Sequence, residues 1–494
     1  MDPQTVDGKP ESNILLALFE GLTTPDPETA EPRPGIASSW RISPDGLRYT
    51  FDLREGLRWS NGDPFEAKDF VYSLRRALAP KLGNPWVSFY FAVRNAKAYF
   101  EKKIDNFQEV GIRAINDLTL EIILEHPVSY FLELLAHYSW APVHQDTIEK
   151  FGEIDERDTR WTRPGNMVCN GPFMLKKWEN GNRITVVKNP YYWGKDEVAL
   201  DEINFYPVSD TATEERMYAS DELDITSKTH VSKIARYQEK GELSLNPHIG
   251  CAWIAINCTR KPFDDVRIRK ALALAINREE IGKVRGVGKG LESYGVVPPG
   301  ILHYKQQKPF FHEDVQEARR LLAEAGYPEG RGFPKTEIIY SLSDENRLIF
   351  EALQAMWKQN LGIHFELVAQ EWKVYISILS HHDFVLSRHC WVGDYNDPTT
   401  MLDIFRSDHA SNFPGWSSAK YDSLLHQAES VVNEEKRIKL LQEAERVFVE
   451  EMPSVPVYWT HSAHLVSPRV KGWYPNTMDM HPWKYVSKKP RVRK

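Results

Sequence analysis

Apolar residues recur at three- and four-residue intervals along several stretches of the chain, a spacing typical of amphipathic helices. In residues 67–78, for example, Phe70, Leu74, Ala77 and Leu78 fall on one face of a helix. The same spacing predicts helices at the following places: 12–19 with Gly21 as its stop, 266–277, 315–325, 347–361, and 421–450 with a break near Asn433.

Shorter stretches alternate between apolar and polar residues, or form brief apolar runs, and these predict strands. They are 47–54, 118–124, 183–188, 338–341 and 384–386. Strands and helices therefore alternate along the chain, which indicates an α/β architecture with several domains. The sequence contains no internal repeat and no low-complexity linker, so a hinge made of several chain crossings is favoured over a loose tether.

Length, apolar runs and net charge indicate a protein of several domains and argue against a membrane-spanning or nucleic-acid-binding protein. A chain of 494 residues predicts two to four domains. The longest apolar runs, such as Ala271–Ile276, are far shorter than the roughly 18–20 residues that cross a bilayer. The formal net charge of −7 argues against nucleic acid as a partner. The 15 tryptophans suit either a well-filled core or ring-lined pockets.

The cysteines and the beginning of the sequence leave the compartment open. Cys169, Cys251, Cys258 and Cys390 form no C-x-x-C pair, so a zinc ribbon or a thioredoxin-type site is not expected. The first residues, Met-Asp-Pro-Gln, do not begin an export signal, which has a short basic segment followed by an apolar one. Either the protein is cytosolic or its export signal has been removed.

Searches for catalytic and cofactor motifs give no positive signal. The sequence has no G-x-S-x-G elbow, no G-x-G-x-x-G loop and no H-E-x-x-H metal pair. We therefore expect no enzyme activity, no cofactor and no metal ion.

One segment, 388–398, combines groups suited to a zwitterionic ligand. It follows a short apolar strand and contains Arg388, Trp391 and Asp394. Taken alone, Asp394 would be a turn-forming residue. In the functional interpretation, its carboxylate accepts hydrogen bonds from an ammonium group while the guanidinium of Arg388 binds a carboxylate.

This segment and many others resemble the oligopeptide-binding proteins of bacterial ABC importers, a family that also contains dipeptide-, nickel- and murein-peptide-binding members. The resemblance covers essentially the whole chain. The matching segments, in order, are 1–3, 8–14, 19–22, 53–55, 59–62, 69–73, 170–173, 189–193, 262–267, 370–372, 419–422 and 455–458.

The resemblance implies an α/β, bilobal fold of the periplasmic-binding-protein type (type II), with three domains and a ligand cleft between two lobes that close around the ligand. Domain I would comprise 1–19, 143–249 and 462–494, domain II 20–142, and domain III 250–461. The implied function is that of an extracytoplasmic subunit that binds short peptides and delivers them to an inner-membrane permease. We expect a monomer in the periplasm or a lipoprotein on the cell surface.

The resemblance also implies roles for individual residues. Asp394 would bind the peptide α-ammonium, and Arg388 would lie near the peptide's C-terminal end. The remaining implied contacts are the strand residues Cys390, Trp391 and Val392, the loop Asp7, Gly8 and Lys9, and the rings of Trp86, Trp253 and Trp372.

Several positions depart from the family pattern. Asn346 replaces a histidine used for a peptide C-terminus, Leu379-Ser380 replaces an arginine–histidine pair, and Ala255 replaces a glutamate. Peptide length and side-chain preference therefore stay open. So do other ligands, namely a murein peptide, a dipeptide or a nickel chelate, and a peptide-sensing or chaperone module without transport.

The family's disulfide falls next to Cys251 and Cys390, each displaced by one position. A shift of one residue turns a strand side chain to the opposite face. A Cys251–Cys390 bridge and two free thiols both stay open at this point.

Overall fold

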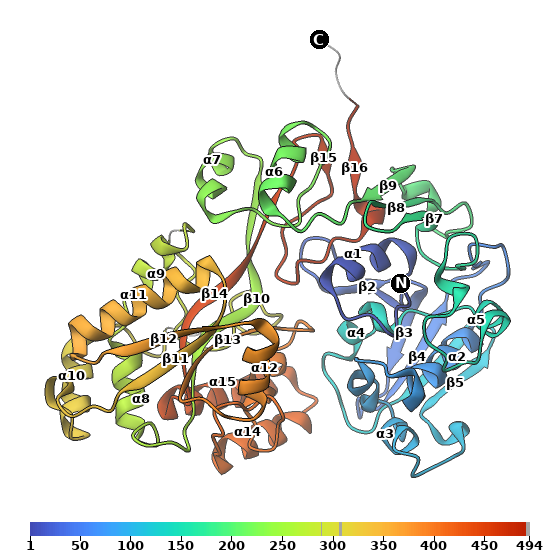
Figure 1. Cartoon of the computed structure of the whole chain (residues 1–494). Coiled ribbons are helices and arrows are strands. Elements are labelled where there is room, and N and C mark those ends of the chain that lie inside the picture. The colour runs from blue at the N-terminus through green and yellow to red at the C-terminus, as the bar shows by residue number, and fades with distance from the viewer. Residues whose placement is uncertain (288, 306–308, 491–494) are drawn as a thin grey trace. The chain divides into compact units, whose positions relative to one another are not determined.

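The computed structural model describes residues 1–287, 289–305 and 309–490, in which helices and strands alternate (Figure 1). The chain forms two compact units. Unit 1 comprises Met1–Thr226 and Val466–Lys494, and unit 2 comprises Ser227–Leu465. The architecture is mixed α/β with more than one domain, as predicted. The finer boundaries of three domains stay a prediction.

Unit 2 is built on a mixed five-stranded sheet with the order β12-β11-β13-β10-β14. β11 is parallel to β12 and to β13, whereas β10 pairs antiparallel with both β13 and β14. Figure 1 shows the two long strands β10 and β14 side by side. The strands are β10 (Leu243–Ile256), β11 (Thr336–Ser341), β12 (Phe365–Gln370), β13 (Leu386–Val392) and β14 (Ser454–Leu465).

Helices cover both faces of this sheet. Tyr340 of β11 stacks on Phe350 of α11, with ring centroids 5.1 Å apart. Trp253 of β10 contacts Phe405, which in turn contacts Phe448 of α15. The helices of unit 2 are α7 (Ile234–Glu239), α8 (Val266–Leu274), α9 (Arg278–Val284), α10 (Val315–Glu324), α11 (Asp344–Leu361), α12 (Trp372–Ser380), α13 (Thr399–Leu402), α14 (Ala419–Glu429) and α15 (Glu434–Glu451), with 3-10 turns at Val231–Lys233, Pro328–Gly330 and Asp403–Phe405.

Unit 1 contains small antiparallel sheets, with the orders β1-β2, β3-β4-β6-β5, β7-β8-β9 and β15-β16. Its strands are β1 (Thr23–Pro25), β2 (Pro32–Pro34), β3 (Ala37–Ile42), β4 (Arg48–Leu53), β5 (Ile112–Asn116), β6 (Thr119–Ile123), β7 (Phe173–Glu179), β8 (Arg183–Lys188), β9 (Glu202–Phe205), β15 (Val470–Lys471) and β16 (Ser487–Lys488). Its helices are α1 (Lys9–Leu18), α2 (Ala67–Ala77), α3 (Ala96–Phe100), α4 (Phe131–Leu134), α5 (Gln145–Phe151) and α6 (Thr211–Ala219), with 3-10 turns at Pro80–Leu82, Val87–Ala92, Phe107–Glu109, Tyr138–Trp140, Arg160–Thr162, Lys195–Glu197 and Trp483–Tyr485.

Capping side chains explain where several helices begin. Glu66 and Asp69 form a capping box at the start of α2. Asn433 accepts a hydrogen bond from the Lys436 amide and starts α15, which confirms the predicted break. The single helix predicted over 266–277 is wrong at its end, because α8 stops at Leu274 and Asn277 caps the next helix, α9.

Within the described ranges, no helix combines the length and the apolar character needed to cross a membrane.

A buried ion pair joins α15 to the turn that follows β13. The guanidinium of Arg437 donates two hydrogen bonds to the carboxylate of Asp397, at 2.7 and 2.8 Å. Both side chains are buried, and Asp397 also accepts a hydrogen bond from the backbone amide of Thr399. This arrangement fixes the turn that carries Asp394.

We predict that Arg437→Ala destabilises unit 2 by roughly 3–5 kcal/mol, because it strands a buried carboxylate. The matched control is Lys439→Ala on the same helix, whose pair with Glu435 is exposed and should contribute at most about 1 kcal/mol. Guanidinium unfolding followed by circular dichroism measures both. Equal unfolding midpoints for the two variants would contradict the structural role of the pair.

Candidate functional site

Asp394 lies two residues beyond the end of β13, where the backbone packs tightly. A side chain at Gly393 would place its Cβ 2.6 Å from Cγ2 of Thr400, so a larger residue there would force Thr400 to shift. The backbone amide of Asp394 donates to Oγ1 of Thr400. Among the described residues no cation pairs with its carboxylate, and burial raises the pKa of Asp394 to about 6. The site thus holds a carboxylate that has no counter-charge among the described residues.

The strand that leads to Asp394 has a free edge. β13 pairs with β10 along its whole length, from Gly250↔Val392 to Ile256↔Leu386. On its other side it pairs with β11 only at Leu386 and Ser387. Within the described part of the chain no strand pairs with 389–392 on that side. Backbone N–H and C=O groups there can pair with an extended ligand.

A buried cationic cluster lies on one face of the sheet. Side chains alternate along β13, so Arg388, Cys390 and Val392 project to the face opposite His389 and Trp391. Nε of Arg388 is buried without a hydrogen-bond partner among the described residues. Its charge interacts mainly with Tyr458 and Cys390.

A second arginine, Arg285, belongs to the same cluster. Its guanidinium lies 3.7 Å from the ring centroid of Tyr458, and its Nη1 is buried without a partner in the described residues. Nε donates to Glu345 at 3.3 Å, and Nη2 lies 2.9 Å from Nδ1 of His461. Burial lowers the pKa of His461 to about 4, so this ring is neutral at pH 7. The cluster therefore presents two cations with free donor groups and one carboxylate, which is half exposed.

The other predicted residues of unit 2 differ in exposure. Trp372 and Val392 are exposed, and Trp391 is half-buried with Nε1 unpaired in the described structure. Trp253 is fully buried against His389 and Phe405. Asn346 is buried too, and its amide donates to the backbone and the hydroxyl of Ser341.

The residues predicted in unit 1 lie next to one another. Nε1 of Trp86 donates to the carbonyl of Val6, directly before the exposed Asp7. Gly8 caps α1, and the ammonium of Lys9 donates to the carbonyl of Asp479. The structure thus brings Trp86 and the 7–9 loop together within unit 1.

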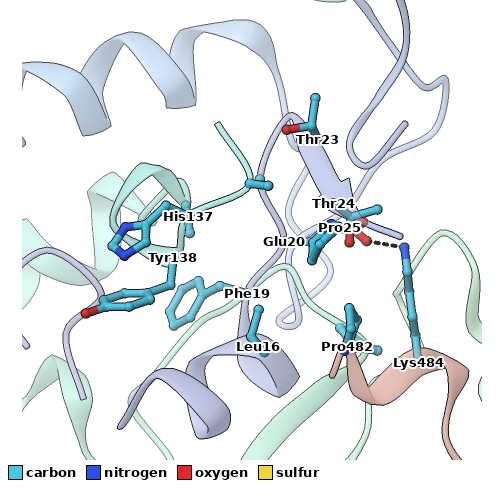
Figure 2. Close-up of a pocket in the computed structure, with 14 residues that line it drawn as sticks. Leu16, Phe19, Glu20, Thr23, Thr24, Pro25, His137, Tyr138, Pro482 and Lys484 are labelled. Atoms are coloured by element: carbon cyan, nitrogen blue, oxygen red, sulfur yellow. Dashed lines mark hydrogen bonds and ion pairs between the residues drawn. The ribbon is translucent and has the colours of Figure 1, made fainter. Parts of the chain in front are cut away.

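Unit 1 also contains a pocket lined by Leu16, Phe19, Glu20, His137 and Lys484 among others (Figure 2). Its charges are paired internally. Figure 2 shows Lys484 bound to Glu20, which also accepts hydrogen bonds from Tyr192 and Trp193. Burial lowers the pKa of His137 to about 3, so the ring carries no charge at pH 7. This pocket offers no free charge to a ligand.

Comparison with known proteins decides the family. Residues 31–413 match the family described as bacterial extracellular solute-binding proteins, family 5. The chain belongs to this family. It is 35% identical to the periplasmic oligopeptide-binding protein OppA of Escherichia coli K12 over 485 residues, which cover 96% of this chain and 87% of that protein.

Solved structures of other family 5 proteins have the same fold. The unliganded open form of the periplasmic murein tripeptide-binding protein MppA superposes with a TM-score of 0.84 at 30% identity, covering 99% of this chain and 94% of that one. The oligopeptide-binding protein OppAIV of Borrelia burgdorferi gives 0.82 at 33% identity, covering 99% and 97%. These likenesses confirm the predicted periplasmic-binding-protein fold.

Sequence analysis missed part of the candidate site of this family 5 protein. Arg285, Glu345, Tyr458 and His461 come from separate parts of the chain, and none belongs to a local motif. Arg285 directly follows α9, and from the sequence alone it would be predicted to be an exposed basic residue at the end of a helix. The one available signal was the match over 455–458, which contains Tyr458.

The bridge between Cys251 and Cys390, left open by the sequence, is not formed in the structure. Cys251 lies opposite Trp391, and Cys390 lies opposite Ala252. The two cysteines therefore project to opposite faces of the sheet. All four cysteines lie within the described residues and are free thiols.

We predict that air-oxidised protein, denatured without reductant, reacts with four equivalents of a thiol reagent, since Cys169, Cys251, Cys258 and Cys390 are all free. The same assay after reduction provides the control. Two reactive thiols before reduction and four after it would show that a bridge forms.

Proposed function

We propose that this chain is the extracytoplasmic solute-binding subunit of an ABC importer, binding short peptides and delivering them to a membrane permease without chemical change. The observation that carries the proposal is the Asp394 carboxylate, which lacks a counter-charge among the described residues and follows a strand with a free edge. The names of relatives, which include an oligopeptide-binding protein and an oligopeptide ABC transporter, support it.

Peptides of different sequence share a charged amino terminus and a polar backbone. In the proposed complex, Asp394 binds the α-ammonium, and residues 389–392 pair with the peptide backbone as an added strand. Cys390 and Val392 contribute through their main chain. A charge-assisted hydrogen bond of this kind contributes about 1.5–3 kcal/mol.

Arg388 is proposed to bind a carboxylate toward the C-terminal end of the peptide, and Arg285 joins it in that role. Nη1 of Arg285 and Nε of Arg388 are buried without a partner in the described part of the chain, and this supports the assignment. A buried N–H without a partner costs free energy that a ligand oxygen recovers. The side-chain amide of Asn346 is less suited to bind a ligand carboxylate, because it already donates hydrogen bonds to the backbone and the hydroxyl of Ser341.

The remaining predicted contacts stay proposals. Trp372 and Trp391 would contact the peptide directly. Trp253, being fully buried, would act by positioning His389 beside the free edge. For Asp7, Gly8, Lys9 and Trp86 of unit 1, a role in ligand binding stays a proposal as well.

The relative MppA binds a murein tripeptide, so such a ligand is the alternative within the family. Mass spectrometry of ligand released from denatured protein distinguishes the two kinds of peptide. We propose a monomer that works in the periplasm, or on the cell surface as a lipoprotein, and that does not bind nucleic acid.

We predict that Asp394→Asn weakens the binding of a free-amino-terminal peptide by roughly 3–5 kcal/mol, because the ammonium loses its counter-charge in a buried site. N-acetylation of the peptide should cost wild-type protein a similar amount. The exposed Asp408→Asn in the same unit is the control and should bind normally. Calorimetry that finds equal affinity for free and acetylated peptides would refute the assignment.

Binding should also depend on pH. The pKa of Asp394 is about 6 without ligand, and a bound ammonium lowers it, so binding below pH 6 must release a proton. Affinity should be highest above pH 6 and fall up to about tenfold per pH unit below it. Asp394→Asn should remove this dependence. A wild-type affinity that stays constant from pH 7 to pH 5 would contradict it.

A further inference from the structure

Three asparagines of the chain are directly followed by glycine, namely Asn61, Asn170 and Asn180. Such a pair is chemically labile. Because glycine has no Cβ, nothing hinders its backbone nitrogen from attacking the side-chain amide of the asparagine before it. All three pairs belong to unit 1, but their surroundings differ in exposure and in hydrogen bonding. These surroundings decide whether the attack can take place in the folded protein.

The pair formed by Asn180 and Gly181 lies at the tip of the hairpin between β7 and β8 (Figure 1). Both residues are exposed, and a Cβ built at Gly181 meets no atom within 4 Å. The turn is closed by the amide of Asn182, which donates to the carbonyl of Glu179 at 2.9 Å. Among the described residues, neither the side chain of Asn180 nor the backbone amide of Gly181 makes a hydrogen bond. Both reacting groups are therefore free to approach each other.

The pair formed by Asn61 and Gly62 is held in place, although Asn61 is exposed. The amide of Gly62 donates to the carbonyl of Trp59 at 2.9 Å. Oδ1 of Asn61 accepts a hydrogen bond from the amide of Asp63, and Nδ2 donates to the Asp63 carboxylate. Attack by the Gly62 nitrogen has to break these hydrogen bonds first.

The pair formed by Asn170 and Gly171 is the most restrained. Asn170 is 2% exposed, and its side chain accepts from the amide of Glu20 and donates to the carbonyl of the same residue. The amide of Gly171 donates to the carbonyl of Leu18 at 2.9 Å. Reaction at this pair requires unit 1 to open locally.

We propose that Asn180 is a site of spontaneous deamidation, with water as the only reagent. The backbone nitrogen of Gly181 forms a bond to Cγ of Asn180, the bond between Cγ and Nδ2 breaks, and the amide proton of Gly181 leaves with Nδ2 as ammonia. Water then opens the resulting five-membered imide at either carbonyl. One opening gives aspartate. The other gives isoaspartate, in which the chain continues through the side-chain carboxyl.

The product changes both the charge and the turn of the hairpin. A new carboxylate appears beside Glu179, whose ion pairs with Lys177 and Arg183 are 2.8 and 3.3 Å long. Isoaspartate also adds one carbon to the backbone inside the ring that the hydrogen bond between Asn182 and Glu179 closes. This hydrogen bond should weaken, so the Asn182 amide should exchange its hydrogen faster in the modified protein.

The test incubates the folded, full-length protein at mildly alkaline pH in water enriched in the heavy oxygen isotope, followed by peptide mapping with mass spectrometry. The incorporated heavy oxygen identifies conversion that takes place during the incubation. Asn180 should convert at least about fivefold faster than Asn61, the factor that one net hydrogen bond provides. Asn170 should stay unconverted. Equal rates at Asn61 and Asn180, or no conversion at Asn180, overturn the inference.

Unfolded protein shows whether the structure causes this order. In concentrated urea, Asn61 and Asn170 should convert at rates similar to that of Asn180, because all three are followed by glycine and none is restrained. Asn180 itself should react in the folded protein nearly as fast as in urea. If the folded and unfolded proteins give the same ratio of Asn180 to Asn61, local sequence rather than structure sets the rates, and the inference is wrong.

A neighbouring asparagine and one variant provide the remaining controls. Asn182 is exposed in the same turn but is followed by Arg183, so it should convert much more slowly, and fragment ions distinguish it from Asn180. Asn180→Gln should abolish isoaspartate in this peptide, measured by isoaspartate-specific enzymatic methylation, and should leave the melting temperature unchanged. Conversion of Asn182 as fast as Asn180, or unchanged methylation of the peptide in the variant, overturns the assignment.

Discussion

The pairing between β10 and β13 is the constraint on which the proposed site depends. Seven residue pairs fix its register, from Gly250↔Val392 to Ile256↔Leu386. Because side chains alternate along a strand, Arg388 and Cys390 share one face while Trp391 projects from the other. The register decides which residues of β10 lie beside each set. A slip of one residue would exchange the two sets and bury the wrong groups. Gly250 and Gly393 permit this pairing, since a Cβ at either position would collide with neighbouring atoms.

Buried arginines hold the surrounding elements against this sheet. Arg278 at the start of α9 donates to the carbonyls of Ser293 and Pro456, and so ties a loop to β14. Arg269 of α8 donates to the carbonyls of Glu451 and Met452, and so ties α8 to the end of α15. In each case, backbone carbonyl oxygens take the place of the water molecules that would otherwise bind the guanidinium. These hydrogen bonds offset the free-energy cost of burying the charge. Arg285 and Arg388 differ from these, because each retains a donor without a partner in the described residues.

Local patterns predicted much of the secondary structure. The strand expected at 183–188 is β8 without change, and the helix break near Asn433 is where that residue caps α15. The long strands β10 and β14 were missed. β10 contains Pro247 and runs through a buried, continuously apolar half, so it shows no clear alternation. Their pairing joins residues more than 190 positions apart, which no local window contains.

The residues of the candidate site also fall into two groups, those that a local pattern predicted and those that only the tertiary fold brings together. Residues 388–394 form one segment, so their chemistry was visible in the sequence. Arg285 comes from the end of a different helix, and only the tertiary fold brings it to Tyr458.

The discontinuity of unit 1 has a consequence for the order of events during synthesis. Unit 2 is one continuous segment, so all its contacts are available once residue 465 has emerged. Unit 1 needs residues 466–494 as well, and the pair between Lys484 and Glu20 closes a loop of 464 residues. Such distant contacts form late, because loop closure costs entropy before any contact compensates it. The amino-terminal part of unit 1 therefore completes its packing only after residues 466–494 have joined it.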